Sequence, residues 1–160
     1  MHATREEAQA KRLQLGLAAA QGHAEAQCML GYMHRLGQGG PEDFAEARRL
    51  LGLAAAQGHA GAQCVLGSMY RVGHGGPIDL AEARRLLGLA AAHDHAGAQY
   101  HLGGMHYHGE GGPVDFLEAR RLLGLAAAQG HANAQYMLGR MHFDGEGGPE
   151  DLAEARRLFG

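Results

Sequence analysis

The sequence has 160 residues, about the length of one domain, and its 46% hydrophobic and 19% charged residues are ordinary for a globular chain, which excludes a largely disordered one. Its 27 glycines stand against only five β-branched residues, too few to build strands, so a β-sheet protein is excluded. The formal net charge of −3 gives no electrostatic reason to expect nucleic acid as a partner, and every apolar run is too short for membrane insertion.

Residue types that carry catalysis are scarce. Ser68 is the only serine, Thr4 the only threonine and Lys11 the only lysine. A phosphate-binding loop needs a lysine followed by serine or threonine after its glycines, and that combination does not occur. Ser68 also lacks the strand-to-helix turn that activates a serine nucleophile. The sequence therefore predicts no enzyme and no cofactor.

Residues 1–22 predict an N-terminal capping helix. Thr4 and Glu7 have the spacing of a capping box, in which each side chain binds a free backbone N–H at the start of a helix. The acidic, helix-like start differs from a secretory leader. We expect this helix to cover one end of the units that follow.

From residue 23 onward the chain repeats one unit of 36 residues. Gly-Gly-Pro recurs four times at this step, and residues 23–58 match residues 59–94 at 26 of 36 positions without a gap. A period of this length is typical of stacked helical units that bury their apolar faces only against neighbours. The predicted copies, which form one continuous solenoid domain, are residues 23–58, 59–94, 95–130 and 131–160.

Each copy predicts two helices. The first begins after His23 and ends at Gly37, where a glycine-rich turn and a proline prevent its continuation. The second begins at Asp43, whose carboxylate is expected to accept a free N–H while Glu46 reaches back to complete a capping box. It is expected to end near Gly58, since glycine accepts the left-handed conformation.

The last copy stops sooner than the others. It ends at Gly160, without the Leu-Ala-Ala-Ala that completes the second helix elsewhere. Two interpretations follow: either the chain is an excised or engineered piece of a longer array, or its C-terminal end stacks on another molecule and the protein self-associates.

The motif Ala-x-Ala-Gln-x-x-Leu-Gly-x-Met, followed by Gly-x-Gly-Gly and then by Asp-x-x-Glu-Ala-Arg-Arg-Leu-Leu-Gly-Leu-Ala-Ala-Ala, resembles the Sel-one-like repeats, which are relatives of the tetratricopeptide repeats. The resemblance covers residues 23–160 and, as a partial unit, residues 8–22. It implies an all-α, right-handed superhelical solenoid of antiparallel helix pairs. It also implies a non-catalytic scaffold or adaptor that binds a protein or peptide along a concave face formed by the first helices. The chain departs from the family at Leu50-Leu51, where aromatics are usual, and at Leu53, where lysine is common.

Comparison of the copies divides the first helix into two faces. Ala26, Leu30 and Met33 are constant and form one helical stripe, which predicts a buried face, and the constant Gly31 predicts close approach of a neighbouring backbone. The variable positions lie on the other face, and they either contact a partner or vary only because they are exposed. The predicted partner-binding residues are Cys28, Tyr32, Arg35, Ser68, Arg71, Tyr100, His101, Tyr107, His108, Tyr136, Arg140 and Phe143.

Histidines suggest two roles. One precedes each first helix, where a ring nitrogen can cap the helix N-terminus, at His23, His59, His95 and His131. In the third copy, His101, His106 and His108 are candidate metal ligands, which makes a histidine-dependent metal-binding protein a further hypothesis. His101 and His108 are two turns apart and need other ligands to share a metal, so no metal is assigned.

Cys28 and Cys64 occupy the same position in adjacent copies, about 8–10 Å apart for packed helices, so we expect free thiols and a reducing, cytoplasmic compartment.

Each Arg-Arg pair follows a glutamate at helical spacing, and forms either a self-neutralised face or a docking row for an acidic protein. An apolar line results if four leucines are exposed, whereas a shifted packing angle would bury them. These are Leu17, Leu53, Leu89 and Leu125.

Overall fold

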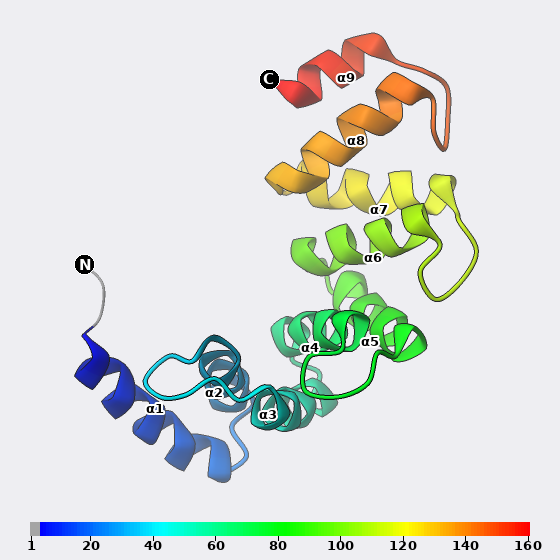
Figure 1. The fold of residues 1–160 in the computed structure, drawn as a ribbon. Coiled ribbons are helices and arrows are strands. Elements are labelled where there is room, and N and C mark those ends of the chain that lie inside the picture. The colour runs from blue at the N-terminus through cyan, green and yellow to red at the C-terminus, as the bar shows by residue number, and fades with distance from the viewer. Residues whose placement is uncertain (1–3) are drawn as a thin grey trace. The chain divides into compact units, whose positions relative to one another are not determined.

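The computed structural model describes residues 4–160, and within that range the chain forms nine α-helices and no strand (Figure 1). The helix that precedes the first copy is α1 (Arg5–Ala20). The first helices of the copies are α2 (Ala24–Leu36), α4 (Ala60–Val72), α6 (Ala96–His108) and α8 (Ala132–Asp144). The second helices are α3 (Phe44–Ala56), α5 (Leu80–Ala92), α7 (Phe116–Ala128) and α9 (Leu152–Phe159). The predicted all-α fold, with two helices in each 36-residue copy, is confirmed.

The helices form two compact units, which comprise the residues up to 86 and residues 87–160, and the division falls within α5. In the first unit, α1 packs on α2, α2 on α3 and α3 on α4. In the second unit, α6 packs on α7, α7 on α8 and α8 on α9. Each unit is therefore a row of helices whose contacts are between neighbours, as expected for a repeat protein.

The constant stripe of the first helix forms the core, as predicted. Ala26, Leu30 and Met33 are all buried, and Leu30 packs with Leu50 of α3 in one apolar cluster. The matching residues of α4 belong to the next cluster, where Ala62, Leu66 and Met69 meet the inner face of α3. Burial of these side chains supplies the main stabilising free energy of each junction.

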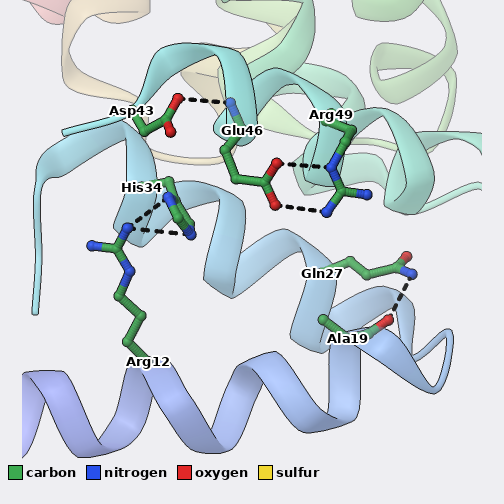
Figure 2. A network of polar contacts seen from close by, with 7 residues as sticks. All are labelled: Arg12, Ala19, Gln27, His34, Asp43, Glu46 and Arg49. Carbon is green, nitrogen blue, oxygen red and sulfur yellow. Dashed lines mark hydrogen bonds and ion pairs between the residues drawn. The ribbon is translucent and has the colours of Figure 1, made fainter. Parts of the chain in front are cut away.

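The helix starts confirm half of the predicted capping box in the repeats. At α1 both reciprocal bonds form, because Thr4 accepts from the Glu7 N–H and Glu7 accepts from the Thr4 N–H. At α3, Asp43 accepts from the Glu46 N–H at 2.9 Å, but Glu46 does not reach back. The Asp43 N–H instead donates to the carbonyl of His34. The Glu46 carboxylate accepts two hydrogen bonds from Arg49 (Figure 2). The prediction for Glu46 was wrong because a bidentate arginine competes better for the carboxylate than one backbone N–H.

Glycine is required at two kinds of position. Gly37 ends α2 with a left-handed φ of 64°, as predicted for a helix stop. Gly31 lies in the middle of α2, and a Cβ there would be 2.8 Å from Cγ of Leu51 and 3.2 Å from the carbonyl oxygen of Ala47. The predicted close approach of a neighbouring helix at Gly31 is therefore confirmed.

Buried glutamines join each first helix to the second helix before it. The Gln27 amide donates to the carbonyl of Ala19 at 3.1 Å, near the C-terminal end of α1 (Figure 2). Gln63 donates in the same way to Ala55. Each of these carbonyls also accepts the N–H of the glycine three residues later, so the glutamine uses the remaining acceptor capacity of the carbonyl and its own buried amide gains a partner.

Arg12, which matches the first arginine of the Arg-Arg pairs in the later copies, has a structural role that the sequence did not indicate. Arg12 donates to the carbonyls of Gln38 and Pro41. It also contacts the His34 ring, at 2.6 Å from Nδ1 (Figure 2). The second Gly of Gly-Gly-Pro, Gly40, lies directly against this guanidinium, so a side chain there would collide with it. The arginine thus fastens a second helix to the turn of the following copy.

The same contact recurs with different partners. Arg48 donates to the Pro77 carbonyl and lies 3.8 Å above the ring of Tyr70, which stands where the other copies have histidine. Arg120 donates to the carbonyls of Glu146 and Pro149 and contacts His142. Histidine and tyrosine therefore serve as alternative acceptors for one arginine position.

Candidate functional site

The variable face of the first helices in the first unit is only partly open. Tyr32 is 42% exposed, and the guanidinium of Arg35 lies 5.1 Å from its ring centre. Arg71 and Cys28 are half-buried. Ser68 is also half-buried, and its hydroxyl donates to the Cys64 carbonyl one turn earlier. Tyr32 and Arg35 are therefore the predicted residues that this unit presents together.

In the second unit the aromatic residues divide into two groups. Tyr100 stacks on the ring of His131, with 4.7 Å between ring centres, and Tyr107 donates to Glu146 and contacts Phe116. These two tyrosines are half-buried at the junction of the third and fourth copies. Tyr136 and Phe143, at the matching positions of α8, are 59% and 56% exposed. Arg140 and His108 are exposed and His101 is half-buried.

A groove between α1 and α2 adds residues that the sequence reasoning missed. It has a volume of about 630 Å³, and its walls are Thr4, Arg5, Glu7, Ala8 and Lys11 of the α1 region and Cys28, Met29, Tyr32, Met33 and Gln38 of the α2 region. The signal that could have revealed it is Lys11, the only lysine, which stands where all four later copies have alanine.

A second hollow lies at the outer side of α8 and α9. It has a volume of about 410 Å³ and is lined by Phe143, Leu152, Ala155, Arg156, Phe159 and Gly160. Leu152 and Phe159 are 54% and 48% exposed. Exposed apolar side chains gathered in one place are typical of a contact surface.

Burial controls the protonation of the polar groups near these surfaces. Burial, and then the charge of Glu25, raise the pKa of the Cys28 thiol to about 11, and burial alone raises the pKa of Cys64 to about 11. Both cysteines are free, as predicted. Burial and the hydrogen bond to Glu146 raise the pKa of Tyr107. At neutral pH these groups are therefore uncharged, and the thiols are poor nucleophiles.

The histidines before the first helices behave as predicted in three copies. Nδ1 of His59 accepts from the Ala62 N–H, and His95 and His131 cap α6 and α8 in the same way. The His23 side chain makes no capping bond. Within residues 4–160 no three His, Cys, Asp or Glu residues are arranged to hold a metal ion, and His101, His106 and His108 do not form such a group.

The arginine pairs and the four repeated leucines lie in different environments. The second arginine of each pair binds the glutamate three residues earlier, which confirms the predicted helical pairing and lowers the pKa of these glutamates. The four leucines are exposed, from 41% at Leu125 to 73% at Leu17, so exposure holds at each of them, of the two alternatives that the sequence left open. No helix in the described part of the chain is both long and apolar enough to span a bilayer.

Comparison with known proteins places these features in a family. The family model for the Sel1 repeat matches residues 24–59, 60–95, 96–131 and 132–160. A protective antigen of uropathogenic Escherichia coli strains, whose solved structure has this repeat fold, is 36% identical with a TM-score of 0.88, and the match covers 92% of this chain and 32% of that one. No curated protein sequence matches significantly.

Two further solved structures, both of Sel1 repeat proteins, are also similar to this chain. A Sel1 repeat protein from Oxalobacter formigenes is 28% identical with a TM-score of 0.87, and the match covers 92% of this chain and 59% of that one. A Sel1 repeat protein from Klebsiella pneumoniae subsp. pneumoniae is 27% identical with a TM-score of 0.63, over 92% of this chain and 74% of that one. The chain thus spans about a third of the first of these three proteins and three fifths of the second. With four matched repeats that cover residues 24–160 almost without interruption, the chain belongs to the Sel1 repeat family.

Proposed function

We propose that this protein is a non-catalytic scaffold that binds a protein or peptide along the concave face formed by the first helices of its repeats. Sel1-repeat proteins generally act as protein-interaction scaffolds. The observation that carries the proposal for this chain is the contrast between a constant buried frame and a variable face that presents Tyr32, Tyr136, Arg140 and Phe143. Tyrosine and arginine are the residue types most often found as anchors in protein interfaces.

The experiment is affinity capture from an extract of the source organism, followed by identification of the bound protein and titration of that purified protein. The triple variant Tyr136→Ala/Arg140→Ala/Phe143→Ala is expected to weaken its binding at least about tenfold, the effect of losing one or two interface anchors. The matched control is Leu117→Ala, because Leu117 is 72% exposed on a second helix. Equal binding by the triple variant, with helicity retained, would exclude this face.

A second function is supported by the hollow on α8 and α9. Phe143, Leu152 and Phe159 expose apolar surface that could bind another copy of the chain, in the manner of a structural, self-assembling array. Sedimentation over a hundredfold range of concentration tests this alternative. A monomer throughout that range would exclude it.

We propose that the protein works in a reducing, cytoplasmic compartment. The two free cysteines with raised pKa values support this, since neither is paired in the structure. Fractionation of the source cells, with detection of the protein by an antibody, tests the proposal.

A further inference from the structure

The groove between α1 and α2 corresponds to a surface that is covered inside the first unit. Lys11 and Cys28 in its walls match Ala47 and Cys64 one copy later. Ala47 is fully buried and Cys64 is 7% exposed, whereas Lys11 is exposed and Cys28 is half-buried. The difference arises because α2 lies over the later pair, whereas no described helix takes that place on α1.

The contacts of α2 show what kind of structure fits this surface. Gly31 brings α2 within contact of the Ala47 carbonyl, and Cys28 lies near Gly61 at the start of α4. The covering element is thus a helix that presents a narrow apolar face to the two helices beneath it. In the second unit the covering helix is α6. It makes the equivalent contacts through its own Tyr100 and Tyr107, which are seven residues apart on one face of the helix.

A second observation comes from the histidines that cap the first helices. Nε2 of His59 lies 2.7 Å from a Glu25 carboxylate oxygen of the covering helix α2, and His131 is stacked by Tyr100 of α6. His23 occupies the same position at the start of α2, is exposed, and makes no capping bond with its side chain. The helix α2 therefore begins without the histidine cap that α4, α6 and α8 have.

The charges of the groove distinguish it from the junctions between copies. Lys11 replaces an alanine that is constant at positions 47, 83, 119 and 155, and Arg5 lies on the same wall. The one acidic side chain in the wall, Glu7, is held by the Thr4 N–H. Both cations are exposed, so the groove favours a ligand with carboxylates beside its apolar face.

We infer that the α1–α2 groove binds an acidic amphipathic helix of a partner protein. Its apolar side chains pack on Cys28, Met29 and Tyr32, and its carboxylates face Lys11 and Arg5. This inference rests on the proposed scaffold function and names one class of partner for it. A helix suits the groove better than an extended strand, because helices cover the equivalent surfaces and the groove offers no unpaired sheet edge.

The test uses three synthetic fluorescein-labelled peptides of about four helical turns. All carry two tyrosines seven residues apart. The first has glutamates flanking them, the second has lysines at those places, and the third is the glutamate peptide with a central proline. Binding to the whole chain is measured by fluorescence anisotropy. We expect the glutamate peptide to bind about tenfold more tightly than the lysine peptide, since ion pairs at an exposed rim have modest strength, and more tightly than the proline peptide.

The protein variants separate charge from folding. Lys11→Ala restores the residue found in every later copy, so the fold is expected to survive, and binding of the glutamate peptide should weaken about threefold. Lys11→Glu should reverse the preference toward the lysine peptide. Tyr32→Ala should weaken both peptides. The matched control is Arg157→Glu, a charge reversal at an exposed residue of α9 that lines neither hollow, and it should leave peptide binding unchanged.

Four outcomes would overturn the inference. The first is equal affinity for the glutamate and lysine peptides, and the second is equal affinity for the helical and proline peptides. The third is sedimentation of the chain as an oligomer that Lys11→Glu dissociates, which would assign the groove to a second copy. If the peptides fail to bind while capture still depends on Tyr136 and Phe143, the groove inference fails and the scaffold function stands.

Discussion

Two neighbouring glycines of α6 meet different surroundings. A Cβ on Gly103 would be 2.9 Å from Cγ of Leu123 and 3.4 Å from the carbonyl oxygen of Ala119, whereas a Cβ on Gly104 would have no atom within 4 Å. Gly103→Ala should therefore lower the free energy of unfolding by about 1–3 kcal/mol through overpacking. Gly104→Ala, the matched control, should leave it unchanged or raise it by up to about 1 kcal/mol, because alanine favours helix. Urea denaturation of both variants checks the pair, and equal destabilisation would contradict it.

At the scale of residues, the comparison of copies predicted burial well. Ala26, Leu30 and Met33 could be assigned to the core because a buried position tolerates little change, and repetition shows that constancy within one sequence. It could not show which variable residues face solvent. Tyr100 and Tyr136 share one position, yet Tyr100 is half-buried beside His131 and Tyr136 is 59% exposed. That difference depends on the neighbouring copy and not on the residue.

The two arginines of each pair have different roles within their helix. Arg120 of α7 reaches the turn of the next copy, where it donates to the carbonyls of Glu146 and Pro149. Arg121 forms an ion pair with Glu118 on the same helix and its side chain is 58% exposed. Arg120→Ala should cost about 1–3 kcal/mol, because partly buried carbonyls lose charged donors, whereas Arg121→Ala should cost less than about 1 kcal/mol. Thermal unfolding of both variants measures the difference, and a larger loss for Arg121→Ala would contradict the assignment.

Two of these arginine contacts depend on pH. Burial first, and then the positive charge of Arg12 or Arg120, lower the pKa values of His34 and His142 below 6.5. Asp43 and Glu46 act in the opposite direction on His34 and Arg49 adds to the lowering, as Asp151, Glu154 and Arg157 do on His142. The unfolded chain then binds more protons than the folded one just below pH 6.5. The stability from these contacts is therefore complete above about pH 6.5 and is lost as the pH falls through the folded-state pKa values.

The double variant His34→Tyr/His142→Tyr tests this dependence. Tyrosine is the native residue at Tyr70, where Arg48 lies over its ring, so the variant retains a partner for each arginine. Its urea midpoint should fall less between pH 7.5 and pH 5.5 than that of the wild type. The control His93→Tyr, at an exposed position, should keep the wild-type dependence. Identical pH profiles for the double variant and the wild type would count against the mechanism.

At the scale of elements, helix ends could be predicted because each carries a local signal, such as Asp43 at a start and Gly37 at a stop. The contacts between helices could not be predicted from the sequence. Arg12 reaches a turn 26 to 29 residues later, and Gln27 reaches a carbonyl of the preceding helix. No periodicity along one helix indicates which arginine of a pair points to a neighbour, because that depends on where the neighbour lies.

The exposed leucines bear on the behaviour of the whole molecule in solution. Leu53 and Leu125, one in each unit, are 44% and 41% exposed. Leu53→Lys/Leu125→Lys should change the free energy of unfolding by less than about 0.5 kcal/mol, as for other surface changes, and should reduce association at high protein concentration. Leu117→Lys, which changes a leucine at a different position of the copy, is the control. Light scattering against concentration compares the three proteins, and undiminished association of the double variant would show that these leucines are not the contact.

The hydrogen bonds that join α1, α3 and α7 to the turn of the next copy affect how the protein unfolds. Such a link, like that from Arg48 to Pro77, joins only adjacent copies. Heat or force can therefore detach an end copy while the others keep their structure, so that the chain frays in steps and does not melt as one body. Backbone amides of the end helices should exchange with solvent sooner than those of α4. A ligand that binds to an end copy would suppress that fraying. Its binding would therefore slow amide exchange in that copy even if no helix changes position.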